Sequence, residues 1–164
     1  MKFNCKAKGS TIFLWFSLSL IIVLFDQFSK IIIMNTLTYG TQYILTSFLN
    51  LMLIYNHGAA FGFLGTAGSW KNFALIAISV ISIFFICYFL KYRVHEHFLG
   101  LSLVLILGGA LGNLINRITY GYVIDFLDLH IGAWHWPTFN FADSSITLGT
   151  AMLLYRELRQ EIIR

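Results

Sequence analysis

The chain has 164 residues, of which 58% are hydrophobic and 11% charged, and its formal net charge is +4. Soluble domains carry about 25% charged residues, so the composition excludes a water-soluble domain and predicts a single integral membrane domain over residues 1–164. The basic residues stand in small clusters at the ends of apolar runs, which is typical of membrane topology signals and not of a nucleic-acid-binding surface.

Four apolar runs predict an all-α membrane protein with four transmembrane helices. The run at 70–90 is the cleanest, with about the 20 apolar residues that a bilayer requires. The first run resembles a signal peptide because lysines precede it, but it is too long and no A-x-A-like cleavage site follows, so we expect it to be retained. The predicted helices cover residues 11–34, 70–90, 98–115 and 138–155.

The positive charges predict the side of the membrane on which each connection lies. Lysines and arginines accumulate on the cytosolic side, and here they gather at both termini and in the connection at 91–97. We therefore expect cytosolic termini and two extracytoplasmic segments, at 35–69 and 118–137. The basic residues expected on the cytosolic side are Lys2, Lys6, Lys8, Lys91, Arg93, Arg156, Arg159 and Arg164.

The outer segment at 35–69 is too long for a simple connection. Its part at 39–55 is rich in Thr, Tyr, Leu and Ile, which predicts short β-like strands. A Gly- and Ala-rich turn carrying Asn56 follows, so we expect a small ordered element and loop on the membrane surface. Glycines would let this segment move as a lid over a site; they are Gly58, Gly62, Gly65 and Gly68.

The stretch at 121–145 places three of the seven acidic residues, Asp125, Asp128 and Asp143, in largely apolar surroundings. Carboxylates are costly there, so we interpret Asp125 and Asp143 as an acid–base pair at the outer edge of the membrane. If the segment around Asp125 is helical, Asp128 shares its face, and the residues alone do not choose between the two. Asp143 also has a plainer interpretation as the N-cap of the last helix.

The depth of the polar residues supports a site at one level. Helices rise about 1.5 Å per residue, which places Asp26, Asn113 and Asp143 about 18–22 Å from the cytosolic ends of three different helices. In an apolar layer about 30 Å thick, that level lies above the midplane. Further polar residues enter from the outer segments, namely Asn56, Arg117, Asp125 and Asn140.

Several of these residues also have a structural interpretation. Asp26 and Lys30 stand four apart and can pair at the outer end of the first helix, with Lys30 extending toward the headgroups. Asn113, Asn116 and Arg117 either cap their helix and bind lipid phosphate, or orient a carboxylate or a substrate. The preceding G-G-A-L-G favours close helix packing.

Other chemistries find little support in the sequence. His57, His130 and His135 lack the spacing of zinc ligands, so we predict no metal site. There is no G-x-S-x-G motif, which argues against a nucleophilic serine, and no phosphate-binding glycine loop. Cys5 and Cys87 have no partner in an oxidising compartment, so we predict no disulfide.

Four motifs occur in order along this frame: N-H-G-A-A-F at Asn56, G-N-L-I-N-R at Asn113, V-I-D-F at Asp125 and F-N-F-A-D-S over 139–144. With them the chain resembles the lipoprotein signal peptidases, the type II signal peptidases of bacteria, over residues 26–155. Two positions depart from the family pattern. His57 replaces a small or polar residue, and Asn116 replaces an aspartate.

The resemblance implies an intramembrane aspartyl endopeptidase of the bacterial inner membrane, with its site at the outer side. Such an enzyme removes the signal peptide from diacylglyceryl-modified prolipoproteins by cutting before the lipidated cysteine, and it is sensitive to the cyclic peptide globomycin. It uses no metal or organic cofactor, and its partners are prolipoproteins and membrane lipids; we expect a monomer. The implied dyad is Asp125 and Asp143, and the implied supporting residues are Asn56, Asn113, Arg117, Asn140 and Asp26.

Two other classes of function remain open at this stage. A small proton-coupled transporter would use Asp26 as its proton carrier, and would fail on Asp26→Asn while tolerating Asp143→Asn. A lipid-binding scaffold would depend on neither residue beyond its stability.

Overall fold

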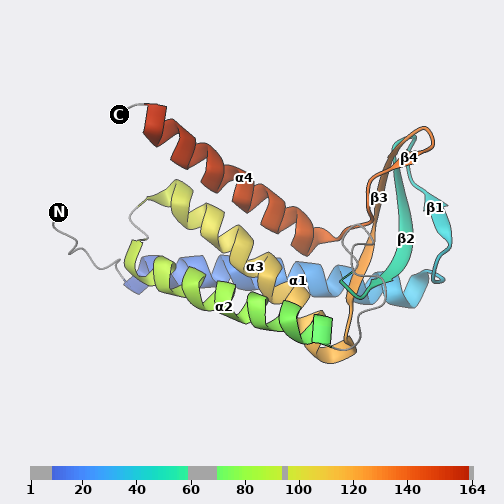
Figure 1. The fold of residues 1–164 in the computed structure, drawn as a ribbon, viewed down its shortest axis with the longest axis horizontal. Coiled ribbons are helices and arrows are strands. Elements are labelled where there is room, and N and C mark those ends of the chain that lie inside the picture. The colour runs from blue at the N-terminus through green and yellow to red at the C-terminus, as the bar shows by residue number, and fades with distance from the viewer. Residues whose placement is uncertain (1–8, 59–69, 94–95, 163–164) are drawn as a thin grey trace.

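The computed structural model describes residues 9–58, 70–93 and 96–162, and within them four helices form a bundle with a small sheet at one end (Figure 1). The helices are α1 (Gly9–Thr36), α2 (Trp70–Arg93), α3 (His97–Tyr120) and α4 (Phe141–Ile162). The strands are β1 (Gln42–Ile44), β2 (Leu49–Asn56), β3 (Val123–Ile131) and β4 (Trp134–His135). The start of α1 and the end of α4 both lie at the end of the bundle away from the sheet (Figure 1).

Three of the helices are long and apolar enough to cross a membrane. Their spans are Thr11–Thr36, Trp70–Tyr92 and His97–Tyr120, with mean hydropathies of 1.9, 2.7 and 2.1. Large apolar side chains on their outer faces are exposed, as expected for a lipid-facing surface. The prediction of four helices is confirmed, although each helix is longer than predicted. That α4 also spans the membrane stays a prediction.

α3 lies at the centre of the bundle and packs against the other three helices. Glycines permit this close approach: a Cβ at Gly108 would lie 2.8 Å from Ile22, and one at Gly109 would collide with the carbonyl oxygen of Ala142. On the α4 side, a Cβ at Gly149 would lie 2.6 Å from the carbonyl oxygen of Ser102. The predicted packing role of G-G-A-L-G is therefore confirmed.

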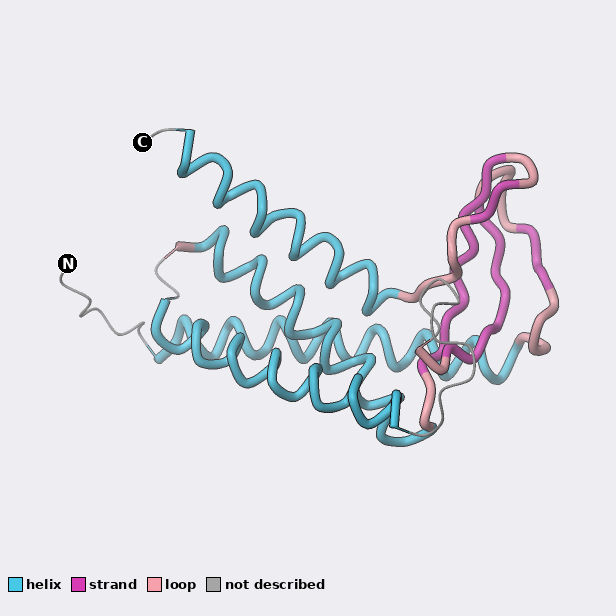
Figure 2. Tube along the Cα trace, in the orientation of Figure 1, coloured by secondary structure: helices cyan, strands magenta, loops and turns pink. Residues whose placement is uncertain are grey.

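The strands, magenta in Figure 2 and labelled in Figure 1, form an antiparallel sheet with the order β1-β2-β3-β4. It packs on the last turns of α1 through an apolar cluster of Ile33, Leu53, Ile124 and Phe126. The strands predicted within 39–55 are confirmed as β1 and most of β2, whereas β3 was not predicted as a strand. In β3 successive side chains alternate between the two faces, so Asp125 and Asp128 point to opposite faces of the sheet.

The structure describes only part of the predicted lid, and it places the end of the third helix later than predicted. The segment 59–69, which holds three of the four glycines of the predicted lid, lies outside the described residues. α3 continues to Tyr120 instead of ending near 115, and Gly121 ends it with a positive φ of 79° and an N–H that donates to Arg117 O across 3.1 Å. Asn116 and Arg117 therefore lie inside the helix.

Candidate active site

Asp125 and Asp143 come from different elements and are joined by Asn140. Asp125 lies on β3, next to the N-terminal end of α4, and Asp143 lies in the first turn of α4. Asn140 donates a hydrogen bond from Nδ2 to Asp125 Oδ1 across 2.6 Å and another from its backbone N–H to Asp143 Oδ2 across 3.3 Å. The structure thus brings together the two carboxylates that the sequence analysis paired.

Asp125 is buried, with 1% of its surface exposed. Besides the bond from Asn140, its Oδ2 accepts a hydrogen bond from Asn56 Nδ2 across 2.8 Å. Burial, and then the negative charge of Asp143, raise the pKa of Asp125 to about 7, although the two asparagine donors act in the opposite direction. A carboxyl group with a pKa near neutrality can both hold and release a proton, which is what general acid–base chemistry requires.

Asp143 is fixed by a capping box with Asn140. Asn140 Oδ1 accepts a hydrogen bond from the Asp143 N–H across 2.9 Å, while Asp143 Oδ2 accepts the return bond from the Asn140 N–H. The N-cap is therefore Asn140, and the interpretation of Asp143 as the N-cap is wrong, because α4 already begins at Phe141 and Asp143 lies in its first turn. The second oxygen, Asp143 Oδ1, accepts a hydrogen bond from Asn113 Nδ2 across 2.7 Å.

Asn113 links Asp143 to a buried ion pair on α1. Lys30 Nζ donates to Asn113 Oδ1 across 3.1 Å and lies 2.8 Å from Asp26 Oδ2. The prediction of an Asp26–Lys30 pair is confirmed. The expectation that Lys30 extends to the headgroups is wrong: the residue is 1% exposed, because Asp26 and Asn113 supply its partners inside the bundle.

Asp26 also holds the start of α4. Its Oδ1 accepts a hydrogen bond from the Ala142 N–H across 2.9 Å. The N–H groups of the first helical turn have no partner within the helix, and a carboxylate there also interacts favourably with the helix dipole. A residue of α1 thereby fixes the turn of α4 that carries Asp143.

Asn116 and Arg117 do not cap α3, because Gly121 ends it. Asn116 Nδ2 donates to Gln27 Oε1 across 3.1 Å. The half-buried guanidinium of Arg117 lies close enough to act electrostatically on Asp143 and Asp125. The interpretation in which these residues cap the helix is therefore wrong, and a role in orienting a carboxylate or a substrate stays a prediction.

Asp128 belongs to a separate polar cluster on the other face of the sheet. Its carboxylate accepts hydrogen bonds from Asn50 Nδ2 across 3.0 Å and from Gln42 Nε2 across 3.1 Å, and His135 Nδ1 lies 2.8 Å from its Oδ1. Burial would raise the pKa of Asp128, but these hydrogen bonds and the charge of His135 outweigh it and lower that pKa. Asp128 therefore remains ionised and is spatially separate from Asp143.

The three histidines of the outer segments pack against other rings. His130 stacks on His135 with ring centroids 5.1 Å apart, and His57 packs against Tyr122 at 5.2 Å. Among the described residues no three His, Cys, Asp or Glu side chains are placed to hold a metal ion.

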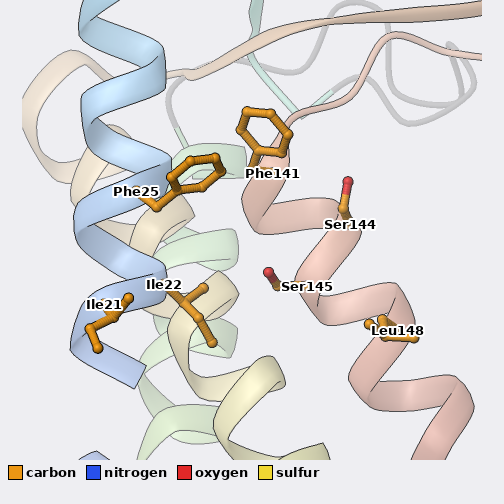
Figure 3. A pocket seen from close by; sticks show the side chains of 7 residues that line it. All are labelled: Ile21, Ile22, Phe25, Phe141, Ser144, Ser145 and Leu148. Atoms are coloured by element: carbon orange, nitrogen blue, oxygen red, sulfur yellow. The ribbon is translucent and has the colours of Figure 1, made fainter. Parts of the chain in front are cut away.

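An apolar groove of about 310 Å³ runs between α1 and α4 (Figure 3). Phe25 and Phe141 close one end of it, with ring centroids 4.8 Å apart. Ser144, Ser145 and Leu148 line its α4 side. Since successive helical residues are about 100° apart, Asp143 points away from this flank of α4, and the groove is not part of the aspartate site.

The role of Gln27 and the contact of Lys30 with Asn113 were not predicted from the sequence. The i, i+4 spacing from Asp26 indicated the ion pair, but nothing in the sequence indicated that Lys30 would reach Asn113 on α3. The contacts of Gln27 could not be predicted from the sequence, because an amide side chain next to an acidic residue is not a recognisable pattern.

Comparison with known proteins gives consistent results for sequence and fold. The family model described as "Signal peptidase (SPase) II" matches residues 18–159. A lipoprotein signal peptidase of Burkholderia mallei (strain SAVP1) is 55% identical over 155 residues, covering 94% of this chain and 93% of its own. One of Burkholderia cenocepacia is 57% identical over 146 residues, covering 89% and 88%. A bacterial membrane enzyme solved by the in meso method superposes with a TM-score of 0.81 at 33% identity, covering 95% of this chain and 92% of its own.

Proposed function

The chain belongs to the signal peptidase II family, and on that premise we propose that Asp125 and Asp143 are the catalytic pair with which it removes signal peptides from prolipoproteins. Membership of the family makes the protein an aspartic-type signal peptidase. The observation that carries the assignment of the pair is the hydrogen bonding of Asn140 to both carboxylates.

The proposed chemistry uses one proton shared by two carboxyl groups. Two neighbouring carboxylates do not both ionise easily, so they titrate as a pair. The ionised member takes a proton from a water molecule, whose oxygen attacks the scissile carbonyl carbon, while the protonated member donates to the carbonyl oxygen. When the C–N bond breaks, the carboxyl group that holds the proton donates it to the departing amine nitrogen, while a hydroxyl of the tetrahedral intermediate gives its proton to the other carboxylate, so that the two carboxyl groups again share one proton.

The supporting residues hold the pair without reacting. Asn56 and Asn140 donate to Asp125, and Asn113 donates to Asp143. Arg117 adds positive charge near the two carboxylates. The Asp26–Lys30 pair acts on the helix, because Asp26 accepts a hydrogen bond from the first turn of α4. In this role each residue sets the position or the charge of a carboxylate, and none needs to touch the water molecule.

The proposed setting is the bacterial inner membrane, with α4 as the fourth span and the sheet on the periplasmic side. The C-terminal ends of α2 and α4 lie at the end of the bundle away from the sheet (Figure 1), and their last turns hold basic residues, as expected for the cytosolic side. The substrate would then enter sideways from lipid, and the chain would act as a monomer. Cysteine labelling of spheroplasts tests the orientation: an impermeant maleimide should react at Ala133→Cys and not at Arg159→Cys in a chain without its native cysteines, and the reverse pattern would invert the topology.

Prolipoprotein processing is tested directly with purified protein in detergent. A diacylglyceryl-modified prolipoprotein and the same protein without the lipid are incubated with the enzyme, and the products are identified by mass spectrometry. We expect cleavage of the modified substrate only, with the lipidated cysteine as the new first residue, and inhibition by globomycin. Cleavage elsewhere, or equal cleavage of both substrates, would contradict the proposed specificity.

A proton-coupled transporter that uses Asp26 is not favoured. A proton carrier must release its partners and meet water in each cycle, whereas Asp26 is fully buried and both its oxygens are occupied by Lys30, Gln27 and Ala142.

A further inference from the structure

Behind the ion pair lies a short polar chain that the proposed chemistry does not use. It consists of Gln27, next to Asp26 on α1, and Asn116 on α3. Gln27 Nε2 donates to Asp26 Oδ2 and to the carbonyl oxygen of Gly112, each across 2.9 Å. Gln27 Oε1 accepts a hydrogen bond from Asn116 Nδ2 across 3.1 Å. A primary amide has two N–H groups and one carbonyl oxygen, so every polar group of the Gln27 side chain is occupied.

Two acceptors on one side and the Asn116 donor on the other together determine which way the Gln27 amide faces. If that amide were rotated by half a turn, its oxygen would face two acceptors, the Asp26 carboxylate and the Gly112 carbonyl, while its NH₂ group would face the NH₂ group of Asn116. Asn116 is 1% exposed, so bulk water does not compete for these groups, and buried hydrogen bonds of this kind specify one arrangement.

The orientation of Gln27 in turn fixes the Asp26 carboxylate. Asp26 Oδ2 receives both Gln27 and Lys30, which leaves Oδ1 for the N–H of Ala142, the residue before Asp143. The carboxylate has little freedom to turn, because it lies directly against the Gly112 backbone, where an added Cβ would be 2.6 Å from Oδ2. A continuous path of contacts therefore leads from Asn116 to the first turn of α4.

We propose that Gln27 and Asn116 are positioning residues of the active site, which lock the Asp26 carboxylate in the orientation that holds the first turn of α4 and hence Asp143. This inference rests on the proposed role of Asp143 as a catalytic residue. Neither Gln27 nor Asn116 contacts the carboxylates of Asp125 or Asp143. They act through Asp26, so their removal impairs turnover and not substrate binding.

Kinetics of prolipoprotein cleavage test this role with two variants of similar side-chain size. Gln27→Met removes both donors, and Asn116→Leu removes the group that orients them. We expect kcat to fall about tenfold or more in Gln27→Met with KM unchanged, since small displacements of a catalytic group cost up to about a hundredfold. Ser102→Ala is the control: it removes a buried hydroxyl from α3 whose hydrogen bond goes only to Phe98 O, and it should retain the kcat of the parent.

The double variant separates a linked pair from two independent effects. Since Asn116 acts only through Gln27, kcat of Gln27→Met/Asn116→Leu should equal that of Gln27→Met within about twofold, whereas independent sites would multiply their losses. Multiplied losses, an unchanged kcat in Gln27→Met, or a rise in KM alone would each overturn the proposal.

Hydrogen–deuterium exchange supplies a readout that does not depend on catalysis. The Ala142 N–H should exchange faster in Gln27→Met than in the parent or in Ser102→Ala, because its acceptor on Asp26 is no longer held in place. Unchanged exchange over 140–145 in a folded Gln27→Met variant would contradict the inference even if kcat fell. A parent that exchanges as expected but does not cleave prolipoprotein would instead contradict the proposed function and leave the positioning of α4 supported.

Discussion

Asn140 donates its side-chain N–H to Asp125 across 2.6 Å, and the same residue caps the helix that carries Asp143. The Asn140 side-chain amide therefore links β3 to α4 and sets the positions of both proposed catalytic carboxylates. Asn140 is fully buried, so bulk water does not compete with its hydrogen bonds.

Asn140→Ala should abolish most cleavage and lower stability. The substitution removes an N-cap, which costs about 0.5–2 kcal/mol of unfolding free energy, and frees Asp125 from its donor. We expect a loss of cleavage rate of about a hundredfold or more, because both carboxylates lose a positioning contact. Cleavage assays and thermal unfolding measure the two effects.

Asn50→Ala is the matched control for Asn140. Asn50 Nδ2 donates to Asp128 across 3.0 Å, so the variant also removes a buried amide–carboxylate bond, but on the other face of the sheet. It should lose stability while the folded protein keeps its cleavage rate. Equal loss of cleavage in the two variants would mean that sheet integrity alone, and not the contact with Asp125, explains the effect.

The raised pKa of Asp125 predicts a dependence of stability on pH. Its carboxyl has a pKa of about 7 in the folded chain against 3.8 as the reference value, so the folded state binds the proton more tightly. The stabilising contribution is therefore complete below about pH 4 and is lost as the pH rises through about 7. The unfolding temperature of the parent should fall over that window relative to Asp125→Asn, which lacks the titrating group. An equal pH dependence in both proteins would contradict the prediction.

Gly112→Ala should disturb the site from a distance. The added methyl group would lie 2.6 Å from Asp26 Oδ2 and 3.3 Å from Ala142 Cβ, and overpacking of this kind costs about 1–3 kcal/mol. We expect reduced stability together with reduced cleavage. Gly132→Ala adds the same group where nothing lies within 4 Å, at a positive φ that costs about 1 kcal/mol, and should leave cleavage unchanged.

Lys30→Met should be strongly destabilising, because it leaves the fully buried Asp26 carboxylate without its cation. Removing one partner of a buried ion pair costs about 3–5 kcal/mol. The double variant Asp26→Asn/Lys30→Met removes both charges and should unfold at a higher temperature than Lys30→Met alone. A double variant less stable than the single one would show that Lys30 stabilises the bundle through contacts other than the ion pair.

The sequence predicted the helices and the level of the polar residues because both follow from regular geometry. A constant helical rise places Asp26, Asn113 and Asp143 at a similar depth, and the structure joins them through Lys30 and Ala142. The small residues of G-G-A-L-G likewise pointed to close packing. Such features are properties of a single helix, so they can be predicted from its sequence without knowing which elements pack against it.

The remaining features depend on contacts between elements and were missed for that reason. The run V-I-D-F-L-D is apolar on both sides of each aspartate, so it has no clear alternation to indicate a strand. Asp125 and Asp128 would share a face only in a helix, and this segment is the strand β3. That the Lys30 side chain points into the bundle could not be predicted, because its partner Asn113 lies on another helix. Asn140 could be predicted as a cap only if the first residue of α4 were known, and helix boundaries are weakly marked in sequence.

The pairing of Asp125 and Asp143 is tested most directly by single-turnover cleavage of a diacylglyceryl-modified prolipoprotein. The rates of Asp125→Asn and Asp143→Asn are compared with those of the parent and of Asp128→Asn, each shown to be folded by its unfolding transition. We predict that Asp128→Asn cleaves at close to the parent rate and that the other two variants lose cleavage by about a thousandfold or more, as expected when a group that takes part in proton transfer is removed. Cleavage that survives in folded Asp125→Asn or Asp143→Asn would contradict the assignment of the catalytic pair.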